Sequence, residues 1–100
     1  MKILLVCNQG MSTSVLVKNM YKYANEDTVI EAKPVTEYAD VAGNYDIILI
    51  GPQIRYQLDE IKNVAKNNGI DADVIDPMAY GMLDGKKVLE QAKKLINKGE

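Results

Sequence analysis

Two uninterrupted apolar runs constrain the fold of this 100-residue chain more than any other feature. Residues 3–7 read Ile-Leu-Leu-Val-Cys, and residues 47–50 read Ile-Ile-Leu-Ile. A strand without a polar face is buried on both sides, which is typical of the central strands of a parallel sheet covered by helices. Two such strands, separated by helical sequence, predict an α/β fold.

Two further strands are expected at the outside of the sheet. Residues 28–34 alternate apolar and polar side chains, and residues 72–75 form a short run between Asp71 and Asp76. Each tolerates water on one side, which favours an edge position. With right-handed crossovers, the four strands form one parallel sheet in the order 2-1-3-4, with helices on both faces.

The first helix is expected directly after the first strand. Residues 8–10, Asn-Gln-Gly, break the strand, and any of the hydroxyl residues at positions 12–14 can serve as the N-terminal cap. Its buried face is predicted from four apolar residues at helical spacing: Leu16, Met20, Tyr23 and Ala24.

Three more helices are expected farther along the chain. They cover residues 37–41, residues 56–66 and a last segment capped by Asp84. The Asn-Asn-Gly sequence at 67–69 stops the second of these, and Pro77 interrupts the chain after the fourth strand. The last helix is expected to bury five residues: Val88, Leu89, Ala92, Leu95 and Ile96.

Length and composition predict a single domain over residues 1–100, located in the cytoplasm. Hydrophobic residues make up 47% and charged residues 26%, which is ordinary for a globular domain. Neither apolar run approaches the roughly 20 residues that span a bilayer. The N-terminus lacks the longer apolar stretch and cleavage site of a signal peptide. We therefore expect no direct membrane insertion.

The residue types exclude several kinds of site. The chain has no histidine and one cysteine, so the usual zinc sites, a disulfide framework and a Ser-His or Cys-His pair are all ruled out. Its 12 basic and 14 acidic residues show no basic stripe, which argues against a nucleic-acid partner. We also expect no metal and no cofactor.

Cys7 is the predicted nucleophile. In the expected sheet the strand order reverses between strands 1 and 3, and ligands bind at the carboxyl ends of these strands, where residues 7–14 and 51–56 lie. Gly10 lets the backbone approach a ligand, while the N-terminus of the next helix attracts anions and lowers a thiol pKa. A lone cysteine is more often simply a small buried residue, but this position favours a nucleophile for phosphoryl groups. The phosphate-binding loop is predicted from seven residues: Asn8, Gln9, Gly10, Met11, Ser12, Thr13 and Ser14.

The stretch Cys-Asn-Gln-Gly-Met-Ser-Thr-Ser at 7–14 resembles the active-site loop of the IIB components of the bacterial phosphoenolpyruvate-dependent sugar phosphotransferase system. It is most similar to the lactose/cellobiose (chitobiose) class, whose loop has the form Cys-x-x-Gly-Met-Ser-Thr-Ser. Further matches extend over nearly the whole chain: Gly51-Pro52-Gln53-Ile54, Asp76, Tyr80-Gly81 and Asp84-Gly85. The resemblance implies a sheet like that of low-molecular-weight tyrosine phosphatases.

The resemblance also implies an enzyme, a phosphotransferase that works through phosphocysteine. Cys7 accepts the phosphoryl group from a phosphohistidine on the IIA partner. It then passes the group to a β-linked disaccharide that is imported through the membrane-bound IIC partner. Four residues are expected near the crevice, without an assigned role: Gln53, Arg55, Asp76 and Tyr80. For Arg55, a solvated position at a helix start is an equally good interpretation.

Two alternatives stay open at this point. A low-molecular-weight phosphatase or arsenate reductase has a Cys-x5-Arg loop, and Asp76-Pro77 stands where such phosphatases keep their general acid. That loop requires arginine at position 13, where this chain has Thr13. The other alternative, a non-catalytic binding domain, predicts that loss of Cys7 affects stability only.

Overall fold

The computed structural model describes residues 1–7 and 11–98, with only the backbone of Met11, Ser12 and Lys98. The elements follow in the order β1 (Lys2–Cys7), α1 (Met11–Tyr21), β2 (Val29–Pro34), α2 (Tyr38–Val41), η1 (Ala42–Asn44), β3 (Ile47–Ile50), η2 (Pro52–Gln57), α3 (Leu58–Asn67), β4 (Asp71–Val74), α4 (Pro77–Gly81) and α5 (Gly85–Lys98). The elements labelled η are 3-10 turns.

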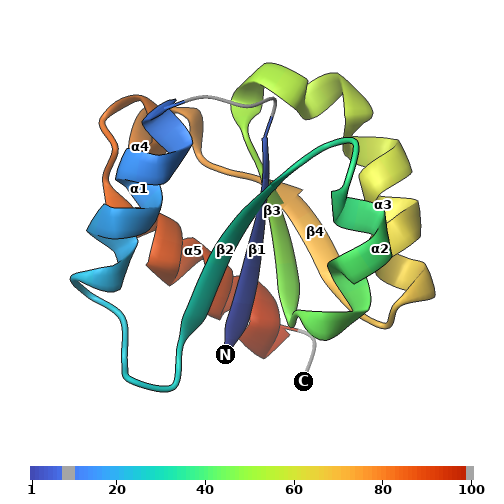
Figure 1. The fold of residues 1–100 in the computed structure, drawn as a ribbon, viewed down its shortest axis with the longest axis horizontal. Helices are drawn as coiled ribbons and strands as arrows, with labels where there is room; N and C mark the ends of the chain where they lie inside the picture. Colours follow the sequence, from blue (N-terminus) through green and yellow to red (C-terminus); the bar gives the residue numbers. More distant parts are fainter. Residues whose placement is uncertain (8–10, 99–100) are drawn as a thin grey trace.

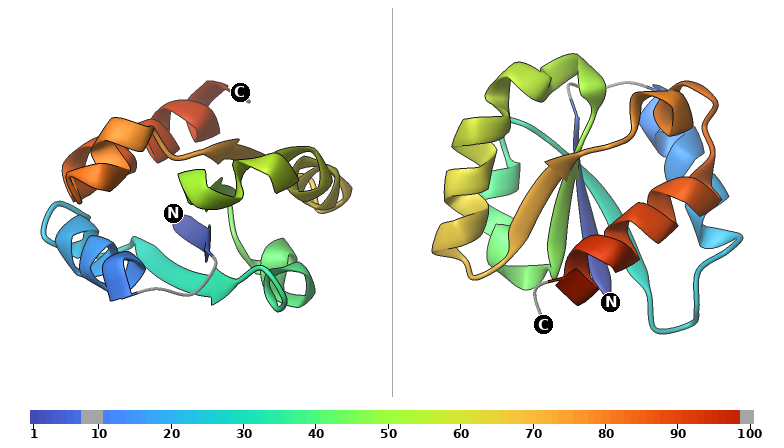
Figure 2. Two further views of the ribbon diagram at one scale, coloured as in Figure 1. Left: turned by 90° about the horizontal axis from the view of Figure 1, so that it is seen from above. Right: turned by 180° about the vertical axis from the view of Figure 1, so that it is seen from behind.

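The four strands form one parallel sheet in the order β2-β1-β3-β4, as predicted (Figure 1). The all-apolar strands β1 and β3 lie in the middle, and the mixed strands β2 and β4 lie outside. Figure 2 shows α1, α4 and α5 on one side of the sheet and α2 and α3 on the other. The three layers are those of the predicted α/β class.

Side chains on the two faces of the central strands pack into two separate hydrophobic cores. In β1, Ile3 and Leu5 pack with α1 and α5, whereas Leu4 and Val6 pack with α2 and α3. The residues of β3 alternate in the same way. Because successive side chains of a strand point to opposite faces, a strand between two helical layers has no position for a polar residue. This is why the two apolar runs predicted the centre of the sheet correctly.

A glycine sets the contact between α1 and α5. The Gly85 backbone N–H donates a hydrogen bond to the Asn19 side-chain oxygen at 2.7 Å. A Cβ atom on Gly85 would lie 2.5 Å from the Met20 backbone nitrogen, closer than real Cβ contacts allow. The start of α5 therefore rests directly on the backbone of α1. Asp84 caps α5 as predicted, since its Oδ1 accepts from the Lys87 N–H at 3.2 Å.

The prediction that Pro77 only interrupts the chain is wrong, because Pro77 begins the short helix α4. Asp76 is its N-cap, and the Asp76 Oδ1 accepts a hydrogen bond from the Met78 N–H at 3.0 Å. Proline suits the first helical position, where an N–H has no intrahelical partner. The Asp-Pro pair is thus a helix start that the sequence pattern contained.

The boundaries of α1 and α3 also differ from the predicted ones. α1 begins at Met11, so the hydroxyl residues at 12–14 lie inside the helix and do not cap it. It ends at Tyr21, and Tyr23 is 52% exposed beyond that end, so its predicted place on the buried face is wrong. A 3-10 turn precedes α3 and takes up Tyr56. The stop after α3 is confirmed by the positive φ of Gly69, 73°.

Within the described ranges, no helix is both long enough and apolar enough to cross a membrane.

Candidate functional site

The carboxyl end of the sheet gathers three connections. The start of α1, the turn η2 and the helix α4 all lie at this end (Figure 1). Backbone hydrogen bonds hold the strand exits together: the Gly51 N–H donates to the Val6 carbonyl at 3.0 Å, and the Ile75 N–H donates to the Ile50 carbonyl at 2.9 Å. Segments that follow β1, β3 and β4 thereby become neighbours, as expected at a switch point in strand order.

Cys7 is the last residue of β1 and carries a free thiol. Its backbone carbonyl accepts from the Val35 N–H at 3.1 Å, which fixes the end of the strand. The thiol is half-buried, and its sulfur lies 4.0 Å from the Lys33 carbonyl oxygen, a weak contact. A half-buried thiol at the carboxyl end of a central strand is held by the backbone and is still accessible to a reacting group.

Three polar side chains from distant parts of the sequence meet beside this strand end. The Tyr80 hydroxyl lies 3.4 Å from the Thr13 hydroxyl, and the two share a hydrogen bond. The Gln53 amide nitrogen donates to the same Tyr80 hydroxyl at 3.2 Å. The cluster of Thr13, Gln53 and Tyr80 thus links α1, η2 and α4.

The backbone of α4 holds Tyr80 firmly. The Tyr80 N–H donates to the Asp76 carbonyl at 2.9 Å, and the Leu83 N–H donates to the Tyr80 carbonyl at 3.0 Å. Ala79 is buried, and the Tyr80 ring packs against the core on the α1 and α5 side. This helix, which the sequence analysis did not predict, is what brings Tyr80 to the site.

The remaining predicted site residues have mixed positions. Ser14 is exposed on α1 and Arg55 is exposed on η2. The Asp76 carboxylate accepts from the Met78 N–H, and the Asp76 backbone bonds to Gln91 and Tyr80, so Asp76 serves the start of α4. The predicted loop positions Asn8, Gln9 and Gly10, together with the side chains of Met11 and Ser12, lie outside the described residues.

Exposed apolar side chains accompany this end of the molecule, and the sequence analysis did not single most of them out. Val15 lies on α1, Tyr56 on η2 and Met78 on α4, all of them well exposed. For Tyr56 and Met78 the signal in the sequence is weak, because an apolar residue in a short segment has no periodicity that would separate an exposed from a buried position.

Two other tyrosines have shifted pKa values, and both pack in the core on the α2 and α3 side. Burial raises the pKa of Tyr38, and the charge of Glu60 adds to the increase. Burial also raises the pKa of Tyr45, with a hydrogen bond to Glu31 and the charge of Glu31 adding to it. These shifts reflect core packing and do not involve the cluster of Thr13, Gln53 and Tyr80.

Comparison with known proteins gives consistent matches over the length of the chain. Residues 2–91 match the family described as PTS system, Lactose/Cellobiose specific IIB subunit. The oligo-beta-mannoside-specific EIIB component of the PTS of Bacillus subtilis (strain 168) is 44% identical over 98 residues, covering 95% of each chain. The galactose-specific EIIB component of Lactococcus lactis subsp. cremoris (strain MG1363) is 38% identical over 103 residues, again covering 95% of each chain.

A solved structure agrees with these sequence matches. The cellobiose-specific phosphotransferase IIB component protein from Borrelia burgdorferi superposes with a TM-score of 0.80 at 39% identity. The match covers 98% of this chain and 93% of that one. The fold and the sequence therefore lead to the same set of relatives.

Proposed function

The chain belongs to the lactose/cellobiose-specific IIB family of the sugar phosphotransferase system, and from this premise we propose that Cys7 is the residue that carries the phosphoryl group. IIB components act as phosphotransferases in sugar transport. In the proposed reaction the Cys7 thiolate attacks the phosphorus of a phosphohistidine on a IIA partner. The S–P bond forms, the P–N bond breaks, and the released imidazole takes up a proton.

The position of Cys7 is the observation that carries this proposal. It is the only cysteine of the chain, and it ends the central strand β1 at the carboxyl end of the sheet, where α1, η2 and α4 meet. The chain contains no histidine, so the phosphohistidine donor has to be another protein. The backbone N–H groups at the start of α1 have no partner within the helix and are suited to hold an anion.

Thr13 favours a carrier over a phosphatase. A phosphatase loop of the Cys-x5-Arg kind places a guanidinium at this position, where it clamps the transferring group through two hydrogen bonds. Thr13 is instead 4% exposed and hydrogen-bonded to Tyr80, and the single arginine of the chain, Arg55, is exposed on η2. A carrier benefits from slow reaction with water, because its phosphocysteine has to survive until it meets the acceptor.

The acceptor in the proposal is a β-linked disaccharide that is imported through a membrane-bound IIC partner, with this chain working on the cytoplasmic side. The names of its relatives mention an oligo-beta-mannoside, galactose and cellobiose. Two of these three are β-linked sugars, which supports the class.

Intact mass tests the proposal directly. The protein is incubated with phosphoenolpyruvate, the general phosphotransferase proteins and a candidate IIA, and we expect it to gain the mass of one phosphoryl group. Cys7→Ser should fold normally and gain none, because a serine hydroxyl is far less ionised than a thiol at neutral pH. Tyr23→Phe, at an exposed tyrosine past the end of α1, is the control and should still be labelled. Undiminished labelling of Cys7→Ser would overturn the proposal.

Hydrolysis of aryl phosphates separates the carrier from the phosphatase. We expect negligible turnover, and discharge of the phosphocysteine to sugar only when membranes with the matching IIC are added. Asp76→Asn should change the rate of transfer to sugar little, because a carrier does not need Asp76 as a general acid. Efficient hydrolysis that collapses in Asp76→Asn would mean that the chain is a phosphatase.

A further inference from the structure

We propose that Tyr80 is a positioning residue for phosphoryl transfer, which acts by holding the first turn of α1 in place relative to β1 and β3. The inference rests on the proposed role of Cys7. Tyr80 need not touch the phosphoryl group. Its hydroxyl joins Thr13 in α1 to Gln53 in η2, and these residues belong to the segments that follow β1 and β3.

Tyr80 contacts the first turn of α1 through the side chain of Thr13. The side chain of Thr13 is almost fully buried, 4% exposed, in the first turn of the helix. A buried hydroxyl needs a hydrogen-bond partner, and the Tyr80 hydroxyl at 3.4 Å provides one. The rotamer of Thr13, and with it the orientation of the first turn, is therefore tied to the position of the phenol. The N–H groups of that turn are the ones that the proposed function assigns to the anion.

Gly51 leaves space for the second hydrogen bond of the cluster, the one that Gln53 donates to Tyr80. A Cβ atom on Gly51 would lie 2.6 Å from the Gln53 Oε1 and 3.8 Å from the Tyr80 ring. The backbone of Gly51 has φ −65° and ψ 144°, which any residue adopts. A side chain at position 51 would therefore displace the Gln53 amide, which folds back over Gly51 to reach the Tyr80 hydroxyl.

Tyr80 itself is well fixed, as a positioning residue has to be. Its helix is capped by Asp76, its backbone is bonded on both sides, and its ring lies against the core. Movement of the first turn of α1 relative to the sheet would thus stretch a hydrogen bond to an immobile partner. Since a misplacement of about 1 Å can lower a rate about 100-fold, loss of this hydrogen bond should affect the rate more than the fold.

The test measures phosphoryl transfer from phosphorylated IIA to Tyr80→Phe, which keeps the ring and loses the hydroxyl. We expect kcat to fall about tenfold and KM for the donor to stay the same, because the lost hydroxyl positions the first turn of α1 and is not proposed to bind the donor. Tyr23→Phe, at an exposed tyrosine past the end of α1, is the matched control and should transfer at the wild-type rate. Gln53→Met removes the hydrogen bond from Gln53 to Tyr80 at an exposed position, and it should lower kcat by a smaller factor.

A double-mutant cycle with Thr13→Val tests whether Tyr80 acts through Thr13. The double variant should be no slower than the slower single variant, since both changes remove the same hydrogen bond between Thr13 and Tyr80. Wild-type kcat in Tyr80→Phe, or losses that multiply in the double variant, would overturn the inference. Either result, with Cys7→Ser still inactive, leaves the proposed function standing. Labelling of Cys7→Ser overturns the proposed function instead.

Discussion

β2 and β4 lie at opposite edges of the sheet, and their outward backbone groups are satisfied by different side chains. On β2 a single phenol does this: the Tyr21 hydroxyl accepts from the Ile30 N–H at 2.8 Å and donates to the Ile30 carbonyl at 2.9 Å. Farther along the same strand, Pro34 has no N–H to expose. Tyr21 is the last residue of α1, so the helix before β2 protects its edge.

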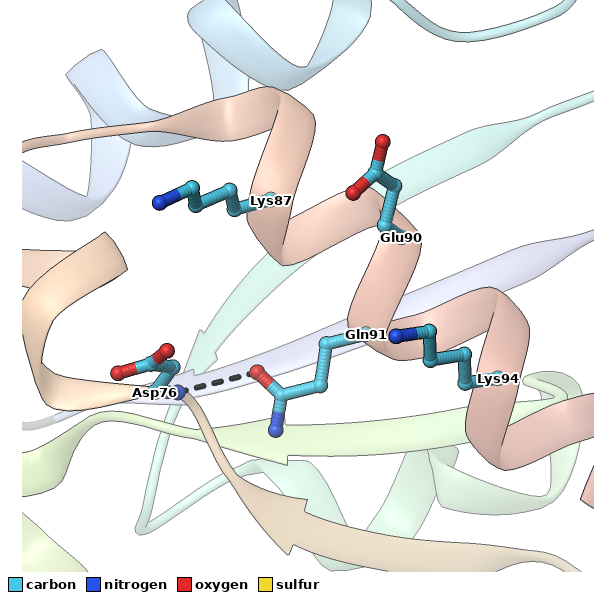
Figure 3. Close-up of a pocket in the computed structure, with 5 residues that line it drawn as sticks. All are labelled: Asp76, Lys87, Glu90, Gln91 and Lys94. Atoms are coloured by element: carbon cyan, nitrogen blue, oxygen red, sulfur yellow. Dashed lines mark hydrogen bonds between the residues drawn. The ribbon is translucent and has the colours of Figure 1, made fainter.

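On β4 the side chain of Gln91 from α5 has the corresponding role. Its amide nitrogen donates to the Val74 carbonyl at 2.7 Å, and its amide oxygen accepts from the Asp76 N–H at 3.0 Å (Figure 3). Two aspartates of β4 add local bonds: the Asp71 Oδ1 accepts from the Ala72 N–H at 2.8 Å, and the Asp73 Oδ1 accepts from the Val74 N–H at 2.7 Å.

The difference lies in the geometry of the two groups. A phenol donates and accepts through one oxygen, so it serves the N–H and C=O of one residue. A primary amide has its donor and acceptor on separate atoms, so it bridges two residues in the way a neighbouring strand would. Outward strand groups left without partners are a template for pairing with other chains. At the β2 edge one phenol serves one residue, whereas at the β4 edge Gln91 bridges Val74 and Asp76 and two aspartates add local bonds.

Gln91→Met should therefore have the largest effect on stability. The variant keeps the length of the side chain and loses both hydrogen bonds, each worth about 1 kcal/mol, so we expect a loss of about 2 kcal/mol in the free energy of unfolding. Urea denaturation measures it, and Glu90→Gln, an exposed neighbour on α5, is the control. A loss below about 0.5 kcal/mol would show that water replaces the amide at this edge.

Tyr21→Phe should cost less, about 1 kcal/mol. It also removes two hydrogen bonds, but the side chain is 46% exposed, so water can reach the freed groups of Ile30. Tyr23→Phe removes a hydroxyl from a tyrosine just beyond α1 and should leave the free energy of unfolding unchanged. If Tyr21→Phe costs as much as Gln91→Met, water does not replace the phenol at the β2 edge.

Asp73→Ala should have a smaller effect again, about 0.5 kcal/mol, because its bond is to the N–H of the next residue and forms easily in other conformations. Asp73→Asn keeps an acceptor oxygen and should restore most of the loss. The pair of variants is compared by the midpoint of urea denaturation. Equal losses in both would indicate that the charge of Asp73 matters and that its hydrogen bond does not.

Alkaline pH should lower the free energy of unfolding through Tyr38 and Tyr45, whose pKa values are both raised, and this is the smallest effect because it is absent at neutral pH. The raised pKa of Tyr45 means that the folded state holds the phenol proton more tightly than the unfolded state. Its contribution to stability is complete below the ordinary tyrosine pKa of about 10 and is lost as the pH rises through the folded pKa. Denaturation at a series of pH values up to that range should show this decline, and Tyr45→Phe should flatten it. An unchanged slope in Tyr45→Phe would assign the decline to other groups.

The sequence by itself determined the sheet and the place of the cysteine. The runs at 3–7 and 47–50 contain only side chains that suit burial on both faces, and that composition indicates a central position in the sheet without any knowledge of the partners. Cys7 follows from the same argument, because it is the end of such a strand at the point where the order reverses. The cap at Asp84 and the stop at Gly69 are local signals, and both were correct.

Tertiary structure alone decided which side chains meet. Thr13 and Tyr80 lie 67 positions apart, and Gln91 reaches Asp76 and Val74, which are 15 and 17 positions away. Helical and strand periodicities describe neighbours a few positions apart, and hydrophobic burial has no direction, so neither specifies such a polar contact. These contacts arise only once packing, down to the absent Cβ of Gly85 against α1, has set the distance between the layers.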